Sequence, residues 1–223
     1  MPGTLPQVLM VLTSHGRIDA DHPTGLWLEE FAEPYLAFVE AGCRVTVASI
    51  AGGVVPVDPR SLEGIDAHQW PRERERLQST LPLTAVVGHF DALFLPGGHG
   101  TMFDLPENRT LQGWITHLLD VGRPVAAVCH GPAGLTGVQR EDGRYLVAGR
   151  RLTGFTNAEE QAVQLDRLMP FLLESRLREE GALFQAGPLW QPHVLVDGML
   201  VTGQNPASSR PAAEAVLELL RGR

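Results

Sequence analysis

The chain has few cysteines, few aromatic residues and no long apolar run. Its only cysteines, Cys43 and Cys129, do not make a disulfide framework, which excludes a small fold held together by several disulfides. No stretch of about 18 apolar residues is present, so we expect no membrane span. Residues 1–4 lack the basic and apolar regions of a signal peptide. These absences predict a reducing, cytoplasmic setting, which would also keep a reactive thiol usable.

Basic residues are also scarce. The 223 residues include 18 Lys and Arg against 26 Asp and Glu, a formal net charge of −8 with no basic cluster. This balance argues against nucleic acid as a partner. A hydrophobic content of 43% with 20% charged residues is ordinary for a globular protein. Since no internal repeat or shift in composition divides the chain, we expect one α/β domain over residues 1–223.

Short apolar runs alternate with helical patterns along the chain. This alternation predicts a mainly parallel sheet with helices on both of its faces. Strands are expected at 8–13, 44–49, 91–95, 124–128, 183–184, 194–196 and 199–201, and a hairpin or pair of short strands at 143–154. Helices are expected after Thr24, which could cap the first of them, and at 72–80, 106–121, 156–166, 170–180 and 205–220. Thr156 or Asn157 could cap the helix at 156–166. The residues between, 51–88, form a long insertion, and such an insertion usually covers a site or an interface.

Cys129 carries the clearest chemical signal. It lies between the apolar run Pro124–Val128 and the pair Gly131-Pro132. This arrangement predicts a sharp turn from a strand into a helix, with the thiol at the carboxyl end of the sheet. The positive N-terminus of that helix would favour a thiolate. Most free cysteines are simply small buried apolar residues, and Cys43 keeps that interpretation.

Two further residues are candidates for moving protons near Cys129. His130 is a natural base, but adjacency alone does not show whether its ring turns toward the thiol. Glu30 lies in a predicted helix among large apolar residues, four positions before Pro34, which would kink that helix. A carboxyl group in such surroundings has a raised pKa and could pass a proton to and from a thiolate. The alternative for Glu30 is an ordinary solvated carboxylate.

A glycine-rich segment follows the strand at 91–95. Gly97, Gly98 and Gly100 allow backbone N–H groups to face a developing oxyanion, although a tight turn alone would also explain them. His99 could line the same pocket or lie in water. The segment matches no nucleotide-binding fingerprint, and the eight histidines show no metal-ligand spacing, so no metal and no cofactor are expected.

Several segments together resemble the ThiJ/PfpI superfamily, which has the flavodoxin-like, class I glutamine amidotransferase-like fold. The resemblance is closer to its branch of heat-shock chaperones and glyoxalase III enzymes. The similar segments are 24–30, 52–53 with 58–61, 96–104, 127–133, 153–160 and 202–208. They span nearly the whole chain.

The resemblance implies roles for individual residues. Cys129, His130 and Glu160, the second acid of the pair Glu159-Glu160, would form a catalytic triad. Glu30 would touch the nucleophile, and the N–H groups of Gly98 and His130 would form the oxyanion site. Gly97, His99 and Trp27 would complete the pocket. It also implies a homodimer and a thiol prone to oxidation.

The implied reaction converts methylglyoxal or glyoxal to lactate or glycolate without glutathione. Cys129 would attack the aldehyde, Glu30 would move a proton between the two carbons, and water assisted by His130 would release the acid. The same residues would also suit a cysteine amidase or peptidase acting on small substrates. Three further alternatives stay open for this chain: a holdase chaperone, an amidotransferase and an enzyme that repairs glycated proteins.

Overall fold

A seven-stranded sheet forms the centre of the computed structural model, which describes residues 5–66 and 68–222. Residues 1–4, where no signal peptide is expected, lie outside the described residues. The strand order is β3-β2-β1-β4-β5-β9-β8; these pairs are parallel except β8, which runs antiparallel to β9. The bounds are β1 Gln7–Leu12, β2 Arg44–Ser49, β3 Leu81–Pro82, β4 Ala92–Leu95, β5 Val125–Val128, β8 Val194–Asp197 and β9 Leu200–Gly203. The predicted mainly parallel α/β fold is confirmed.

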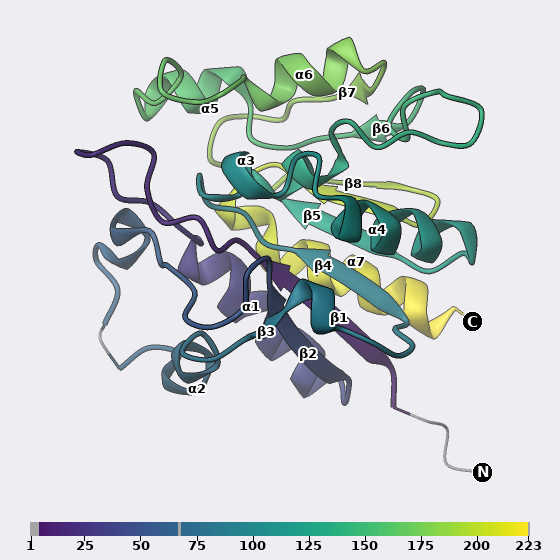
Figure 1. Ribbon diagram of the computed structural model, residues 1–223, viewed down its shortest axis with the longest axis horizontal. Helices are drawn as coiled ribbons and strands as arrows, with labels where there is room; N and C mark the ends of the chain where they lie inside the picture. The colour runs from purple at the N-terminus through teal and green to yellow at the C-terminus, as the bar shows by residue number, and fades with distance from the viewer. Residues whose placement is uncertain (1–4, 67, 223) are drawn as a thin grey trace.

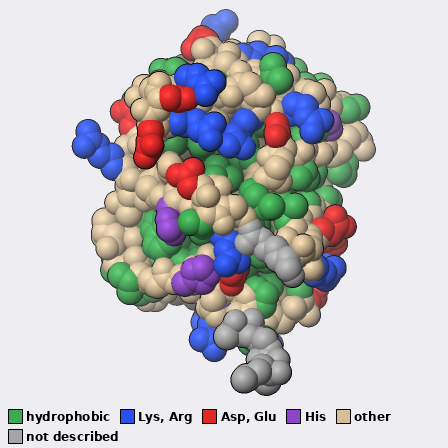
Figure 2. All heavy atoms as spheres, turned by 90° about the vertical axis from the view of Figure 1, so that its right-hand side faces the viewer, with side chains coloured by type: hydrophobic (Ala, Val, Ile, Leu, Met, Phe, Trp, Pro, Cys, Tyr) green, Lys and Arg blue, Asp and Glu red, His purple; other side chains and the backbone are tan. Residues whose placement is uncertain are grey.

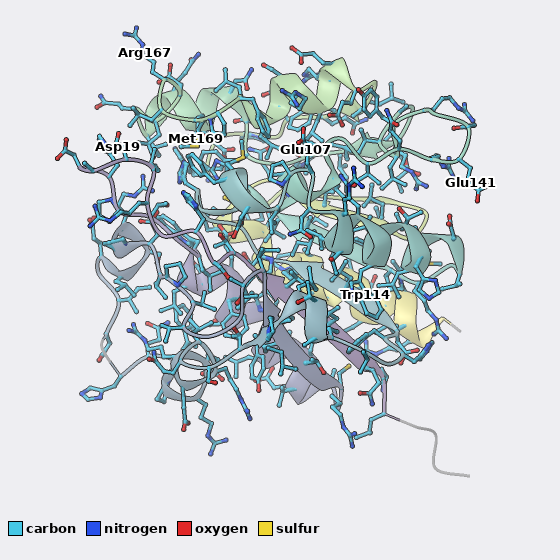
Figure 3. All side chains as sticks on the ribbon, in the orientation of Figure 1. Asp19, Glu107, Trp114, Glu141, Arg167 and Met169 are labelled. Carbon is cyan, nitrogen blue, oxygen red and sulfur yellow. The ribbon has the colours of Figure 1, made fainter. Side chains whose placement is uncertain are left out.

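Helices cover both faces of the sheet (Figure 1). Helices α1 (Leu28–Glu40) and α7 (Ser209–Arg221) pack side by side on one face, and α4 (Arg109–Asp120) packs on the other. Strand β1 serves both faces because successive side chains point in opposite directions. Val8, Met10 and Leu12 pack with α1 and α7, whereas Leu9 and Val11 pack with α4. On α4, Trp114, labelled in Figure 3, meets the ring of Phe90 edge to face at 5.4 Å.

A smaller layer lies beyond α4, at the top of Figure 1. It contains α5 (Asn157–Ala162), α6 (Leu173–Glu179) and a two-stranded parallel sheet of β6 (Arg151–Leu152) and β7 (Leu183–Phe184). A capping box begins α5: Thr156 accepts from the Glu159 N–H, and the Glu159 carboxylate accepts from the Thr156 N–H. This cap places the next residue, Glu160, on the first turn of α5.

The insertion 51–88 has little regular structure. It contains a 3₁₀ turn at Pro59–Leu62, the short helix α2 (Pro71–Arg76), β3 and a second 3₁₀ turn at Leu83–Ala85. Asp58 begins the first of these turns by accepting a hydrogen bond from the Arg60 N–H. Arg60 is thereby directed toward the carboxyl ends of the strands, where it meets His99.

Three local predictions were wrong. Thr24 does not cap α1, which begins at Leu28 after Trp27; its hydroxyl donates to Asp58 instead. The predicted helix 106–121 begins only at Arg109, and a separate turn of helix, α3 (Thr101–Asp104), precedes it. The predicted pair of strands at 143–154 is limited to β6, which pairs with β7 and not with a neighbouring segment.

Charged side chains of both signs are mixed over the face shown in Figure 2. Among the described residues, no helix is both long and apolar enough to cross a membrane.

Candidate active site

Cys129 occupies the turn that directly follows β5. Its φ angle is 56°, a left-handed conformation that costs a side-chain-bearing residue of order 1–3 kcal/mol. Two backbone hydrogen bonds hold it there: its N–H donates to Gly203 at 2.9 Å, and its carbonyl accepts from Phe155 at 2.8 Å. A Cβ at Gly131 would meet the carbonyl oxygen of Leu95 at 2.2 Å, so the turn requires glycine at that position. The predicted sharp turn is therefore present.

The predicted activation of the thiol by a helix N-terminus is wrong. A 3₁₀ turn of five residues, Gly131–Leu135, follows Cys129, and so short a turn has little dipole to stabilise a charge. Burial raises the pKa of the Cys129 thiol well above its ordinary value, and the negative charge of Glu30 raises it further. The thiol is only 3% exposed. Activation must therefore come from neighbouring proton acceptors and from the Gly98 N–H, whose hydrogen bond lowers the pKa of the thiol, and not from a helix dipole.

His130 faces the thiol. Its Nδ1 lies 3.4 Å from the Cys129 sulfur, and its Nε2 lies 2.6 Å from Oε2 of Glu160. A carboxylate only accepts hydrogen bonds, so Nε2 carries the proton of the neutral ring and Nδ1 presents its lone pair to the thiol. The ring stacks against Phe155, with centroids 4.3 Å apart. Cys129, His130 and Glu160 thus have the geometry of a nucleophile, its base and the group that orients the base.

A second histidine shares the Glu160 carboxylate. His99, expected either in the pocket or in water, is buried, and its Nε2 lies 2.7 Å from Oε1 of Glu160. Its Nδ1 lies 3.1 Å from Nη2 of Arg60. Because a guanidinium only donates, Nδ1 accepts and Nε2 donates. Burial, followed by the charge of His130, lowers the pKa of His99 to about 4, so its ring is neutral at neutral pH.

Glu160 is held as a carboxylate. Burial alone would raise its pKa, but the electrostatic attraction and hydrogen bond of His130, together with the hydrogen bond of His99, outweigh burial and hold the pKa well below its usual range. The chain of contacts continues outward, since Asp58 accepts from Nε of Arg60 at 2.9 Å and from its Nη2 at 2.5 Å. Asp58, Arg60, His99, Glu160, His130 and Cys129 therefore form one continuous polar chain.

Glu30 approaches the thiol from α1. It is fully buried, as its position among large apolar residues predicts. Its Oε2 accepts the N–H of Gly97 at 2.7 Å, while among the described residues its Oε1 meets no N–H or hydroxyl donor. Burial raises the pKa of Glu30 from 4.5 to about 8, although Cys129 and the Gly97 N–H partly oppose this shift. Glu30 is therefore mostly protonated at neutral pH. Its pKa lies close enough to neutral pH for the group both to donate and to accept a proton.

The two glycines after β4 have different tasks. Gly97 uses its N–H to hold Glu30, so that N–H does not face the cavity. Gly98 has a φ of 97° and directs its N–H at the Cys129 sulfur. A Cβ at Gly98 would meet the carbonyl oxygen of Gly25 at 2.2 Å. Among the described residues, the N–H groups of Gly98 and His130 donate to no protein oxygen, which leaves both free for an oxyanion.

A cavity of about 380 Å³ opens above the sulfur. Trp27 lines it, as the resemblance implies, together with Gly98 and His99. Sequence reasoning missed several of its walls: Arg60 and Glu63 come from the insertion, Phe155 from the loop before α5, and Trp190 from the loop before β8. Arg60 and Phe155 stood within segments already recognised as similar to the superfamily. Nothing in the sequence around Trp190 marks it as part of the site.

One group of side chains could hold a metal ion. The possible ligand atoms of His99, His130 and Glu160 lie within 4.8 Å of one another. Histidine spacing does not reveal this group because its members are about 30 positions apart. In the structure the two imidazole Nε2 atoms and the carboxylate oxygens are already joined by hydrogen bonds. The predicted absence of a metal stays a prediction.

Comparisons with known proteins point to a single family. Residues 24–219 match the model of the DJ-1/PfpI family. The glutathione-independent glyoxalase HSP31 of Saccharomyces cerevisiae is 31% identical over 96% of this chain and 98% of its own. The crystal structure of glyoxalase III from Candida albicans is 28% identical, with a TM-score of 0.87 over 96% of this chain and 97% of that one. The rapid encystment protein of 24 kDa from Francisella tularensis is 33% identical, with a TM-score of 0.92 over 97% and 99%.

Proposed function

The chain belongs to the DJ-1/PfpI family, and from this premise we propose that it is a glutathione-independent glyoxalase. It converts methylglyoxal and related 2-oxoaldehydes to 2-hydroxy acids. The observation that carries the proposal is the position of the Cys129 thiol, which lies between the buried carboxyl group of Glu30 and the imidazole of His130. An isomerisation needs a proton carrier close to the carbon atoms that exchange hydrogen, and Glu30 provides one.

The first step adds the sulfur to the aldehyde. In the reactive form the pair of Cys129 and Glu30 carries a single proton, and the sulfur is a thiolate when that proton lies on Glu30. The thiolate attacks C1 of methylglyoxal, the N–H groups of Gly98 and His130 stabilise the oxyanion, and Glu30 protonates it. The product is a hemithioacetal, and Glu30 is left as a carboxylate.

The second step moves hydrogen between the two carbons. The Glu30 carboxylate removes the C1 hydrogen as a proton, which gives an enediolate with its negative charge on the C2 oxygen. Glu30 then returns that proton to C2, and the proton of the C1 hydroxyl passes to the C2 oxygen. C1 thereby becomes the carbonyl of a lactoyl thioester on Cys129, and Glu30 is again a carboxylate. His130, oriented by Glu160, takes a proton from water, and the resulting hydroxide releases lactate and the thiol. The net reaction adds one water and needs no cofactor.

The setting of the reaction is also proposed. A small 2-oxoaldehyde is the partner molecule, nucleic acid and membranes are not partners, and the enzyme works in the cytoplasm. The cysteines support the cytoplasmic location, because Cys43 and Cys129 are both free thiols and form no disulfide with each other. The resemblance to the glyoxalase III branch supports a homodimer.

A cysteine amidase or peptidase is the second candidate function. The geometry of Cys129, His130 and Glu160 favours it, since this arrangement also suits acyl transfer. Such a hydrolase needs no proton carrier at Glu30. The buried carboxyl group at that position favours the glyoxalase.

The test replaces Glu30 by glutamine, which keeps the shape of the side chain. We expect Glu30→Gln to lose at least about 100-fold in kcat for methylglyoxal, because general acid–base catalysis supplies ~10²–10⁴-fold. Glu75→Gln, an exposed change on α2, is the control and retains full activity. Full turnover by Glu30→Gln contradicts the glyoxalase mechanism. The hydrolase is supported if the native chain shows no glyoxalase activity and both it and Glu30→Gln hydrolyse small amides.

A further inference from the structure

The cavity above Cys129 is much larger than methylglyoxal. Its volume is about 380 Å³. Methylglyoxal has five non-hydrogen atoms and occupies on the order of 100 Å³, judged from the ~30 Å³ that one water molecule occupies in the liquid. Most of the cavity therefore stays empty of substrate when methylglyoxal is bound. Ligand pockets usually bury most of the surface of the molecule that they select.

The cavity has aromatic walls. Phe155 packs between His130, at 4.3 Å, and Trp190, at 5.9 Å between ring centroids. Trp27 lines the same cavity. Flat apolar rings attract other rings through stacked or edge-to-face contacts. The walls thus offer more to an aryl group than to a methyl group.

Trp190 is held in place by a buried network. Its side chain is 45% exposed, and its backbone has a left-handed φ of 61°. Its backbone N–H donates to Oε1 of Glu159 at 3.1 Å, and Glu159 is itself fully buried. Gln204 and Asn205 donate to the same oxygen at 3.0 and 2.9 Å. The buried carboxylate thus fixes the backbone of Trp190 at the wall of the cavity.

The same network holds the residues on either side of Trp190. Gln204 accepts the N–H of Gly187 at 2.7 Å, and Asn205 donates to the carbonyl of Gln191 at 2.9 Å. These bonds fix the loop 187–191 at both ends. The backbone of Trp190 is thereby held in one position beside the cavity, which limits how far this wall can move to fit different substrates.

We propose that the preferred substrates are 2-oxoaldehydes with an aromatic or similarly bulky apolar substituent, and that Trp190 is the residue that determines this preference. The inference rests on the proposed glyoxalase function and deepens it. Phenylglyoxal is the probe for this class. The same steps convert it, with one water, to mandelate, with the ring of the substrate lying against Phe155 and Trp190.

The experiment measures kcat/KM for phenylglyoxal and methylglyoxal without glutathione. Initial rates of mandelate and lactate formation are used, because aryl glyoxals also react slowly with guanidinium groups. The native chain is compared with Trp190→Ala, Trp190→Phe and Leu189→Ala. Leu189 is the matched control: it is the neighbouring residue of the same loop, is also 45% exposed, and does not line the cavity.

We expect the native chain to favour phenylglyoxal at least about tenfold, since one methylene group in an apolar pocket already gives about 10–200-fold discrimination. Trp190→Ala lowers this ratio at least about fivefold, because the loss falls mainly on phenylglyoxal. Trp190→Phe retains most of the preference, and Leu189→Ala retains all of it.

Two results separate this inference from the proposed function. If methylglyoxal gives lactate but the native chain has no preference for phenylglyoxal, or Trp190→Ala lowers both activities equally, the substrate inference is overturned and the glyoxalase stands. If neither 2-oxoaldehyde is converted, the proposed function fails.

Discussion

The carboxyl group of Glu30 binds its proton far more tightly in the folded chain than a solvated glutamate does, because burial raises its pKa from 4.5 to about 8. A raised pKa stabilises the fold most at low pH. That contribution is complete below about pH 4.5 and is lost as the pH rises to about 8, by about 1.4 kcal/mol per pH unit. The group that suits proton transfer therefore destabilises the fold at alkaline pH.

Glu30→Gln is expected to change how stability depends on pH. Glutamine carries no ionisable group, so the variant does not lose this contribution as the pH rises. Between about pH 4.5 and about 8, its free energy of unfolding therefore increases relative to that of the native chain, by about 1.4 kcal/mol per pH unit. Urea denaturation across this interval measures the difference. Glu75→Gln, whose side chain is exposed, should follow the native chain at every pH. Parallel curves for Glu30→Gln and the native chain would contradict the buried, protonated carboxyl group.

The sequence predicted the burial and backbone turns of individual residues better than their side-chain directions and pKa values. The apolar neighbours of Glu30 predicted its burial, and Gly131-Pro132 predicted the turn at Cys129. The direction of the His130 ring was not readable, because Glu160 sets it from 30 positions away. The pKa of Cys129 was predicted in the wrong direction, since a sequence does not show that Glu30 and burial outweigh a short turn of helix.

Helix α5 shows how one element positions a site residue. Its capping box joins Thr156 to Glu159, and the next residue, Glu160, orients both His99 and His130. The cap was predicted at Thr156 or Asn157, and Thr156 is the residue that provides it. Helix α3, by contrast, was missed because a helix of four residues shows no apolar period.

Thr156→Ala should weaken both the fold and the activity. Loss of the cap costs about 1 kcal/mol, within a usual range of ~0.5–2 kcal/mol, and lowers the melting temperature. Because Glu160 begins on the same turn, kcat for methylglyoxal should fall further than the stability loss alone explains. Thr156→Ser keeps the hydroxyl and is the control. Native kcat in Thr156→Ala at a temperature where it is fully folded would show that the cap does not position Glu160.

For the molecule as a whole, local patterns predicted the sheet and its covering helices because short apolar runs and helical spacing are local properties. The pocket was less predictable. Its walls come from the residue before α1, the insertion, the loop after β4, the turn after β5 and the loops before α5 and β8, and only the fold brings them together. Resemblance to the superfamily identified the segments that carry chemistry, whereas Trp190 and the continuous chain from Asp58 to Cys129 emerged from the structure.

The central claim is that Cys129 and Glu30 convert a 2-oxoaldehyde without glutathione or any cofactor. The most direct measurement incubates the purified chain with methylglyoxal alone and follows the products by proton NMR. The account predicts that lactate accumulates with the native chain and that none forms with Cys129→Ala. An absence of lactate at high concentrations of native enzyme, or equal lactate from Cys129→Ala, would contradict it.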